Sequence, residues 1–179
     1  MLNRVRKLLW CMVGLFLAPA TDRKGAYGHF RETMLDGVSQ EMYSNFIDEE
    51  LGPCAHIWGL TSSIKSTWEN ADKGDWVLFY TQENQYEYAA QIKTKQHNPD
   101  FGDSIRRDCL KDVSSDRDWD YLLLFDDPIE ISVSGDNVAE LFDYNNRYPV
   151  RFLRVINERL EAIESEYGGV DGFITAISE

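Results

Sequence analysis

Short apolar runs separated by turn residues dominate the hydrophobic pattern of this chain. Trp76 to Thr81 form a nearly continuous apolar run after Gly74, and Tyr86 to Lys95 carry apolar residues at alternate positions. Glu83 to Gln85 provide a hairpin connection between these two runs. Further strands are predicted at residues 13–18, 55–60, 121–125, 129–133 and 152–156. The pattern thus predicts a sheet of short strands.

Helical periodicity is weaker and falls between the strands at irregular intervals. Helices are predicted from Ser39 to about Leu51, and at residues 62–70, 101–110, 158–167 and 171–177. Asn157 precedes the fourth of these helices as a cap, and Gly168 ends it. Because strands and helices do not alternate regularly, we expect an α+β fold with a small curved β-sheet flanked by short helices.

The N-terminus supports two interpretations. In the first, residues 13–179 are one domain that begins with a buried strand, and residues 1–12 are an extension of it, with Met12 as an alternative start. In the second, basic residues from Arg4 to Lys7, the apolar run Leu8 to Leu17 and the small residues Ala18 and Ala20 form a secretory signal. The apolar run is too short to span a bilayer. We favour the strand, and with it a cytoplasmic protein without a membrane partner.

The charge of the chain is strongly negative. It carries 31 acidic against 18 basic residues, a formal net charge of −13, and its arginines outnumber its lysines. This balance resembles proteins of salt-loving archaea, and an ordinary acidic cytosolic protein remains the alternative. Bulk electrostatic attraction to nucleic acid is therefore not expected, and any nucleic-acid recognition would rest on stacking, hydrogen bonds and shape.

Motifs for metal, nucleotide or nucleophilic chemistry are missing from the sequence. The three cysteines and three histidines are scattered and lack metal-binding spacing, so we expect no metal site and no cofactor. One enzymatic alternative stays open: Asp75 followed by Gln91-Ile92-Lys93 echoes the D…(E/D)-x-K pattern of PD-(D/E)xK-like nucleases. Gln91 stands where that pattern has its second carboxylate, which weakens a Mg²⁺ site.

Five segments together resemble EVE-type domains of the PUA-like class, in particular archaeal EVE domains associated with McrB-type modification-dependent restriction systems. They are Phe30 to Thr33, Ala55 to Leu60, Lys73 to Tyr80, Lys95 to Pro99 and Tyr148 to Val155. The resemblance implies a PUA-like pseudo-barrel and a non-enzymatic module that binds a modified base, such as a methylated one, in nucleic acid. It favours DNA over RNA, and a separate motor or nuclease subunit as partner.

Two tryptophans also resemble the aromatic cage of YTH domains. Ile57-Trp58 is similar to that family's first cage position, and Trp119, ahead of the strand that leads to Pro128, is similar to the second. A base must leave a duplex before a cage can enclose it, and the cage must repay a few kcal/mol for this step. Trp119 stands among acidic residues, and we expect its side chain to be exposed.

The resemblance to a base reader suggests a role for each candidate residue. Trp58 and Trp119 would sandwich the base, Tyr80 or Phe30 would close against the methyl group, and His97 and Asn98 would read the edge of the base. The basic residues nearest that loop, Lys93, Lys95, Arg106 and Arg107, would hold phosphates. Trp68 and Trp76 are predicted to lie in the core instead.

Overall fold

The computed structural model describes residues 12–21, 25–112 and 118–178 of the 179-residue chain. Except for Met12, the predicted N-terminal extension lies outside the described residues, as does the basic start of the signal-like segment. Within the described ranges, no helix combines the length and apolarity needed to cross a membrane.

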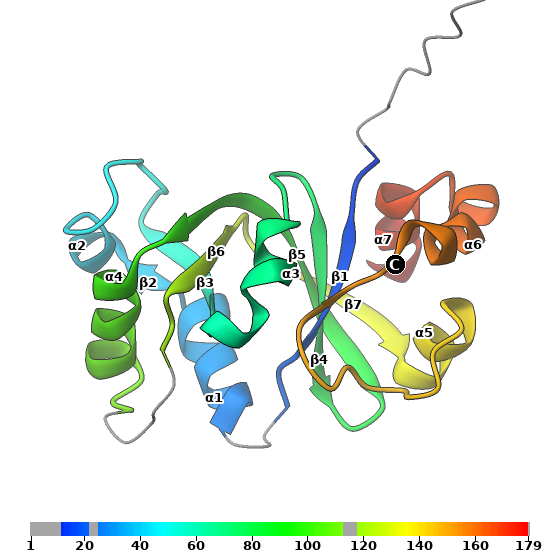
Figure 1. Ribbon diagram of the computed structural model, residues 1–179, viewed down its shortest axis with the longest axis horizontal. Helices are drawn as coiled ribbons and strands as arrows, with labels where there is room; N and C mark the ends of the chain where they lie inside the picture. The colour runs from blue at the N-terminus through cyan, green and yellow to red at the C-terminus, as the bar shows by residue number, and fades with distance from the viewer. Residues whose placement is uncertain (1–11, 22–24, 113–117, 179) are drawn as a thin grey trace, which may run out of the picture.

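Eight strands form one curved sheet (Figure 1). In chain order they are β1 (Leu15–Pro19), β2 (Val38–Ser39), β3 (Cys54–Leu60), β4 (Trp76–Gln82), β5 (Gln85–His97), β6 (Tyr121–Phe125), β7 (Ile129–Ser134) and β8 (Leu153–Arg154). The spatial order is β2-β3-β6-β5-β4-β1-β8, and β7 pairs with β5 beside this path. Only β1 and β4 run parallel among these pairs.

The long strand β5 joins the two halves of the sheet. Its first part, residues 85–91, pairs with β4, and its last part, residues 92–97, pairs with β6. Shifts of register occur in both pairings, at Tyr80 and between Ile92 and Thr94. Such irregularities bend a strand and increase its twist, which accounts for the curvature of the sheet.

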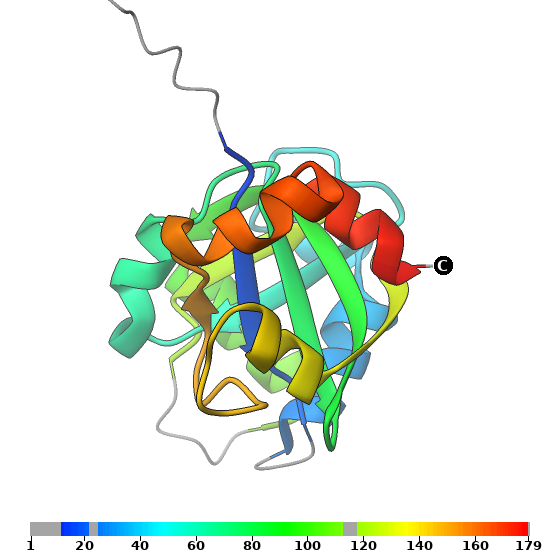
Figure 2. The ribbon, with the colours of Figure 1, turned by 90° about the vertical axis from the view of Figure 1, so that its right-hand side faces the viewer.

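Short helices flank the curved sheet. They are α1 (Ala26–Phe30), α2 (Gln40–Tyr43), α3 (Lys65–Glu69), α4 (Pro99–Ser104), α5 (Gly135–Leu141), α6 (Asn157–Tyr167) and α7 (Val170–Ser178), with π-helical turns at Arg31–Leu35 and Ile105–Cys109 and a 3₁₀ turn at Ser62–Ile64. Helices α5, α6 and α7 lie at one end, and α2 and α4 lie at the other (Figures 1 and 2).

Three clusters of buried apolar side chains result from this arrangement. One cluster includes Phe16, Phe30 and Trp58 from β1, α1 and β3. A second fills the space between the sheet and the C-terminal helices, and a third lies between β3, β6 and the helices α2 and α4. The third cluster contains Trp119. The two candidate cage tryptophans therefore belong to different clusters.

The structure confirms the predicted α+β fold and most strands. The first strand is present, since Leu15 to Ala18 are almost completely buried and β1 lies between β4 and β8. The helix predicted from Ser39 to Leu51 is wrong in length, because α2 ends at Tyr43 and the chain then turns. The helices α1 and α5 were not predicted, since neither presents a long amphipathic pattern.

Candidate functional site

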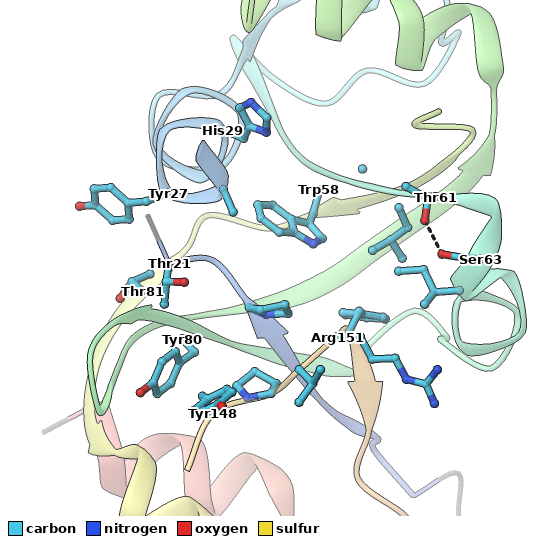
Figure 3. A pocket seen from close by; sticks show the side chains of 18 of the residues that line it. Thr21, Tyr27, His29, Trp58, Thr61, Ser63, Tyr80, Thr81, Tyr148 and Arg151 are labelled. Atoms are coloured by element: carbon cyan, nitrogen blue, oxygen red, sulfur yellow. Dashed lines mark hydrogen bonds between the residues drawn. The ribbon is translucent and has the colours of Figure 1, made fainter. Parts of the chain in front are cut away.

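A cavity with a volume of about 1140 Å³ opens on one face of the curved sheet (Figure 3). Its walls come from α1, from the ends of β1, β3 and β4, and from the segment that leads into β8. The lining comprises Pro19, Thr21, Ala26, Tyr27, His29, Trp58, Gly59, Leu60, Thr61, Ser63, Ile64, Tyr80, Thr81, Gln82, Glu83, Trp119, Arg147, Tyr148, Pro149, Val150, Arg151 and Phe152. Three of the predicted site residues, Trp58, Tyr80 and Trp119, are among them.

Trp58 projects from β3 into this cavity (Figure 3). Its indole is braced edge-on by Phe30, at a ring-centroid distance of 6.1 Å, and by Phe79, at 5.7 Å. Only 7% of Trp58 is exposed. Edge-to-face contacts of this kind fix the orientation of an aromatic ring. The Trp58 ring is therefore held rigidly. One side of it packs in the core, and the other side forms part of the cavity wall.

Trp119 is buried, which corrects the prediction that its acidic neighbours would keep it exposed. Its exposed fraction is 7%, because the ring packs directly on the backbone of Gly59. A β-carbon added to Gly59 would lie 2.1 Å from two atoms of the indole, and one added to Gly102 would lie 1.9 Å from the carbonyl oxygen of Trp119. His29 contacts the same indole edge-on at 5.7 Å. Gly59 therefore provides space for the indole of Trp119, and Gly102 provides space for its backbone carbonyl.

The two indoles do not form the parallel slot that the resemblance suggested. Their centroids are 6.5 Å apart and their planes are tilted by 43°. A planar ring stacked between two others needs parallel planes about 7 Å apart, twice the usual carbon contact distance. Trp58 and Trp119 contact each other instead, and the open space lies beside them in the cavity.

Tyrosines and polar groups form the remainder of the lining. Tyr80 and Tyr148 contact each other with centroids 6.3 Å apart. The hydroxyl of Tyr80 also accepts a hydrogen bond of 2.5 Å from the backbone N–H of Asn84. Across the cavity, the hydroxyls of Thr61 and Ser63 are 2.7 Å apart (Figure 3). The cavity therefore combines aromatic surface with donors and acceptors, as small-molecule and base pockets do.

Three other predicted base-binding residues lie outside the lining. Phe30 is completely buried in the core behind Trp58. The ring of His97 stacks on Tyr121 at 4.6 Å. Asn98 is the N-cap of α4, where its side chain accepts a hydrogen bond of 3.0 Å from the N–H of Phe101. Packing and helix capping account for these positions, and the structure brings none of the three to the cavity.

The four predicted phosphate-binding residues also lie away from the cavity, and three of them have structural partners. Lys95 donates to the carbonyl oxygens of Trp68 and Glu69, at 3.1 and 2.8 Å. Arg106 lies 3.7 Å from Asp103. Arg107 lies 3.1 Å from Asp108, and this hydrogen bond lowers the pKa of the Asp108 carboxyl. Lys93 lines a smaller cavity of about 420 Å³ elsewhere.

The cations that do lie at the main cavity are Arg147 and Arg151. Arg147 lies 3.0 Å from the carboxylate of Glu83. The sequence pattern did not show that the segment containing these arginines lines the same cavity as Trp58. The signal available was the resemblance of Tyr148 to Val155 to a motif of the family, which marked the segment without giving it a role.

Asp75, the carboxylate of the nuclease alternative, has a structural environment. It is 5% exposed and accepts hydrogen bonds from the N–H of Gly14, at 2.6 Å, and of Asp72, at 3.0 Å. These bonds tie the start of β1 to the turn before β4. Among the described residues, no group of three or more His, Cys, Asp or Glu is placed to hold a metal ion.

Comparisons with known proteins reveal a likeness among solved structures. No protein-family model matches the chain, and no curated protein matches it significantly. Among solved structures, the chain is similar to the N-terminal domain of Thermococcus gammatolerans McrB bound to m5C DNA. The TM-score is 0.64 at 22% sequence identity, and the match covers 86% of this chain and 96% of that one. The likeness confirms the predicted resemblance at the level of the fold.

Proposed function

We propose that this domain is a non-enzymatic module that takes a modified base, extruded from DNA, into the cavity lined by Trp58, Trp119 and Tyr80. The observation that carries the proposal is the cavity itself: a rigid indole and polar groups border a space large enough for a nucleotide. The shared fold supports DNA as the ligand, because the similar McrB domain is bound to m5C DNA.

In this proposal, stacking on an aromatic ring holds the base, and hydrogen bonds to its edge identify it. The base lies against the cavity side of Trp58, and the edge of Trp119 limits how deeply it enters. Thr61 and Ser63 lie within the same cavity and offer hydroxyls to the base edge. A methyl group adds only about 1 kcal/mol by burial, so discrimination depends on how well the cavity fits around it.

The electrostatic contribution is small in this proposal. Two arginines, Arg147 and Arg151, lie at the cavity, while the chain as a whole carries a net charge of −13. Arg147 is paired with Glu83, so these residues give at most two phosphate contacts and a slope no steeper than about −2 in a plot of log K against log salt. Such a domain suits a role as the recognition part of a larger system, with a separate motor or nuclease subunit acting on the DNA.

The test is a binding panel of oligonucleotides with one central modified base. Duplexes containing 5-methylcytosine, N6-methyladenine or only plain bases are titrated at two salt concentrations, with matching RNA as a further arm. We expect one modified DNA to bind more tightly than its plain counterpart. Equal affinity for all DNA duplexes contradicts the proposal, and preference for a modified RNA moves the function to RNA.

A matched pair of variants assigns the site. Trp58→Phe keeps an aromatic ring in the core but reduces the surface offered to a base, and we expect it to lose part of the roughly 1–3 kcal/mol that a full base–aromatic stack contributes. Trp68→Phe is the control, because Trp68 is a partly buried indole outside the cavity lining. Equal affinities of the two variants would remove Trp58 from the site.

A further inference from the structure

The segment Arg147 to Arg151, here called the rim segment, carries exposed apolar side chains at the cavity. Val150 is 73% exposed and Tyr148 is 41% exposed. Val150 is the most exposed large hydrophobic residue of those that the structure describes. Both residues also line the cavity that contains Trp58. The exposed apolar side chains of the rim segment therefore lie where they can contact a molecule that approaches the cavity.

Anchors on both sides hold the rim segment in place. At its start, Arg147 lies 3.0 Å from Glu83, and its carbonyl oxygen packs so closely on Gly135 that an added β-carbon would lie 2.1 Å away. At its end, the ring of Phe152 stacks on Phe16, with centroids 5.1 Å apart and planes 8° apart. Pro149, between the two exposed apolar residues, is buried and has a fixed φ.

The position of the tip relative to the cavity suggests what it contacts. Tyr148 lies against Tyr80 on the cavity wall, which leaves Val150 as the projecting group. Arg151 follows directly and is exposed at the same cavity (Figure 3). An apolar side chain is suited to the apolar interior of a base stack, and a cation next to it is suited to the neighbouring phosphate.

Resting on the proposed function, we propose that the rim segment is a wedge for duplex DNA. Val150 enters the stack at the place that the extruded base leaves, and Arg151 contacts the neighbouring phosphate. Opening a stack costs a few kcal/mol, and apolar wedges offset this cost by filling the gap. The wedge has a role only in a duplex, since a single strand has no paired stack to restore.

The experiment compares Val150→Ser with Ile156→Ser on two forms of the same oligonucleotide. Ile156 is a matched control, because it is 52% exposed on the same stretch of chain and lies outside the cavity lining. The probes are a duplex with one central 5-methylcytosine and the corresponding single strand. 2-Aminopurine beside the modified base reports unstacking by its fluorescence. Circular dichroism verifies that both variants fold.

The expected result is a loss that depends on the form of the DNA. Val150→Ser lowers affinity for the duplex roughly tenfold and reduces the 2-aminopurine signal, while affinity for the single strand changes less than about twofold. Ile156→Ser changes neither. Equal losses on duplex and single strand, or no loss on the duplex, overturn the wedge while the base-binding function stands. Native protein that prefers neither 5-methylcytosine nor N6-methyladenine over the plain base, in either form of the DNA, overturns the proposed function itself.

Discussion

Gly59→Ala tests whether the position of Trp119 depends on a missing side chain in β3. The added β-carbon would lie 2.1 Å from two ring atoms of Trp119, whereas ordinary contact begins at 3.4 Å. The indole must therefore retreat by about 1.3 Å or more, away from a backbone that is fixed by pairing between Gly59 and Leu122. Overpacking of this kind costs typically about 1–3 kcal/mol of folding free energy.

Urea denaturation followed by circular dichroism measures this cost. We expect the midpoint for Gly59→Ala to fall by roughly 0.5–1.5 M relative to the native protein. Gly28→Ala is the control, because no atom lies within 4 Å of its added β-carbon in α1. Replacing a helical glycine by alanine stabilises by about 0.5–1 kcal/mol, so this variant should shift the midpoint in the opposite direction.

A double-mutant cycle identifies Trp119 as the side chain responsible. Trp119→Ala removes the ring atoms that the new β-carbon would meet, so Gly59→Ala should cost little in that background. We expect a coupling of about 0.5–3 kcal/mol between the two changes. Additive effects within about 0.5 kcal/mol would refute the packing of Trp119 on Gly59. Trp119 would then not be held in the cavity wall by its contact with Gly59.

Three further predictions concern groups away from the cavity. Asp75→Ala should destabilise the fold by about 2–3 kcal/mol in thermal or urea unfolding, because the N–H of Gly14 loses its buried acceptor; an unchanged midpoint would return Asp75 to consideration as a catalytic residue. Asn98→Ala should cost about 1 kcal/mol of stability by removing the cap of α4 but leave oligonucleotide affinity unchanged; a selective loss of affinity would show that Asn98 reads the base. Burial raises the pKa of Tyr86 above its ordinary value of 10.0, so its neutral form stabilises the fold fully below pH 10 and less as the pH rises further. Tyr86→Phe should therefore flatten the loss of stability at alkaline pH, and identical pH profiles would contradict this.

Most of the strands were predictable, because apolar runs and alternation mark them locally. The apolar run of β4 and the alternation of β5 give their type and approximate bounds, and the predicted bounds of β6 agree with the structure. Helix lengths were less predictable. After Ser39 the apolar residues Met42, Phe46 and Ile47 have helical spacing, yet α2 ends at Tyr43. The helical spacing of these three residues indicates that their side chains pack on the same side, but it does not show that the helix continues through them.

The candidate site was only partly predictable. Trp58 and Trp119 were found through their resemblance to the cage tryptophans of YTH domains, but the burial of Trp119 depends on Gly59 and Gly102, which are distant from it in sequence. Asn98 illustrates a competing signal that was available, since Asn followed by Pro is typical of a helix N-cap and first turn. The rim segment lies about ninety residues after Trp58 in the sequence, and only the folded chain brings the two together.

The place of β1 has a consequence for biogenesis. Of the strands of this sheet, β1 is synthesised first, yet its two hydrogen-bonded neighbours, β4 and β8, are made much later, and β8 is complete only at Arg154. Pairing between such distant parts of a chain slows folding and leaves an apolar segment waiting for its partners during synthesis. Leu15 to Ala18 are therefore the residues that a chaperone would have to shield until β8 has been synthesised.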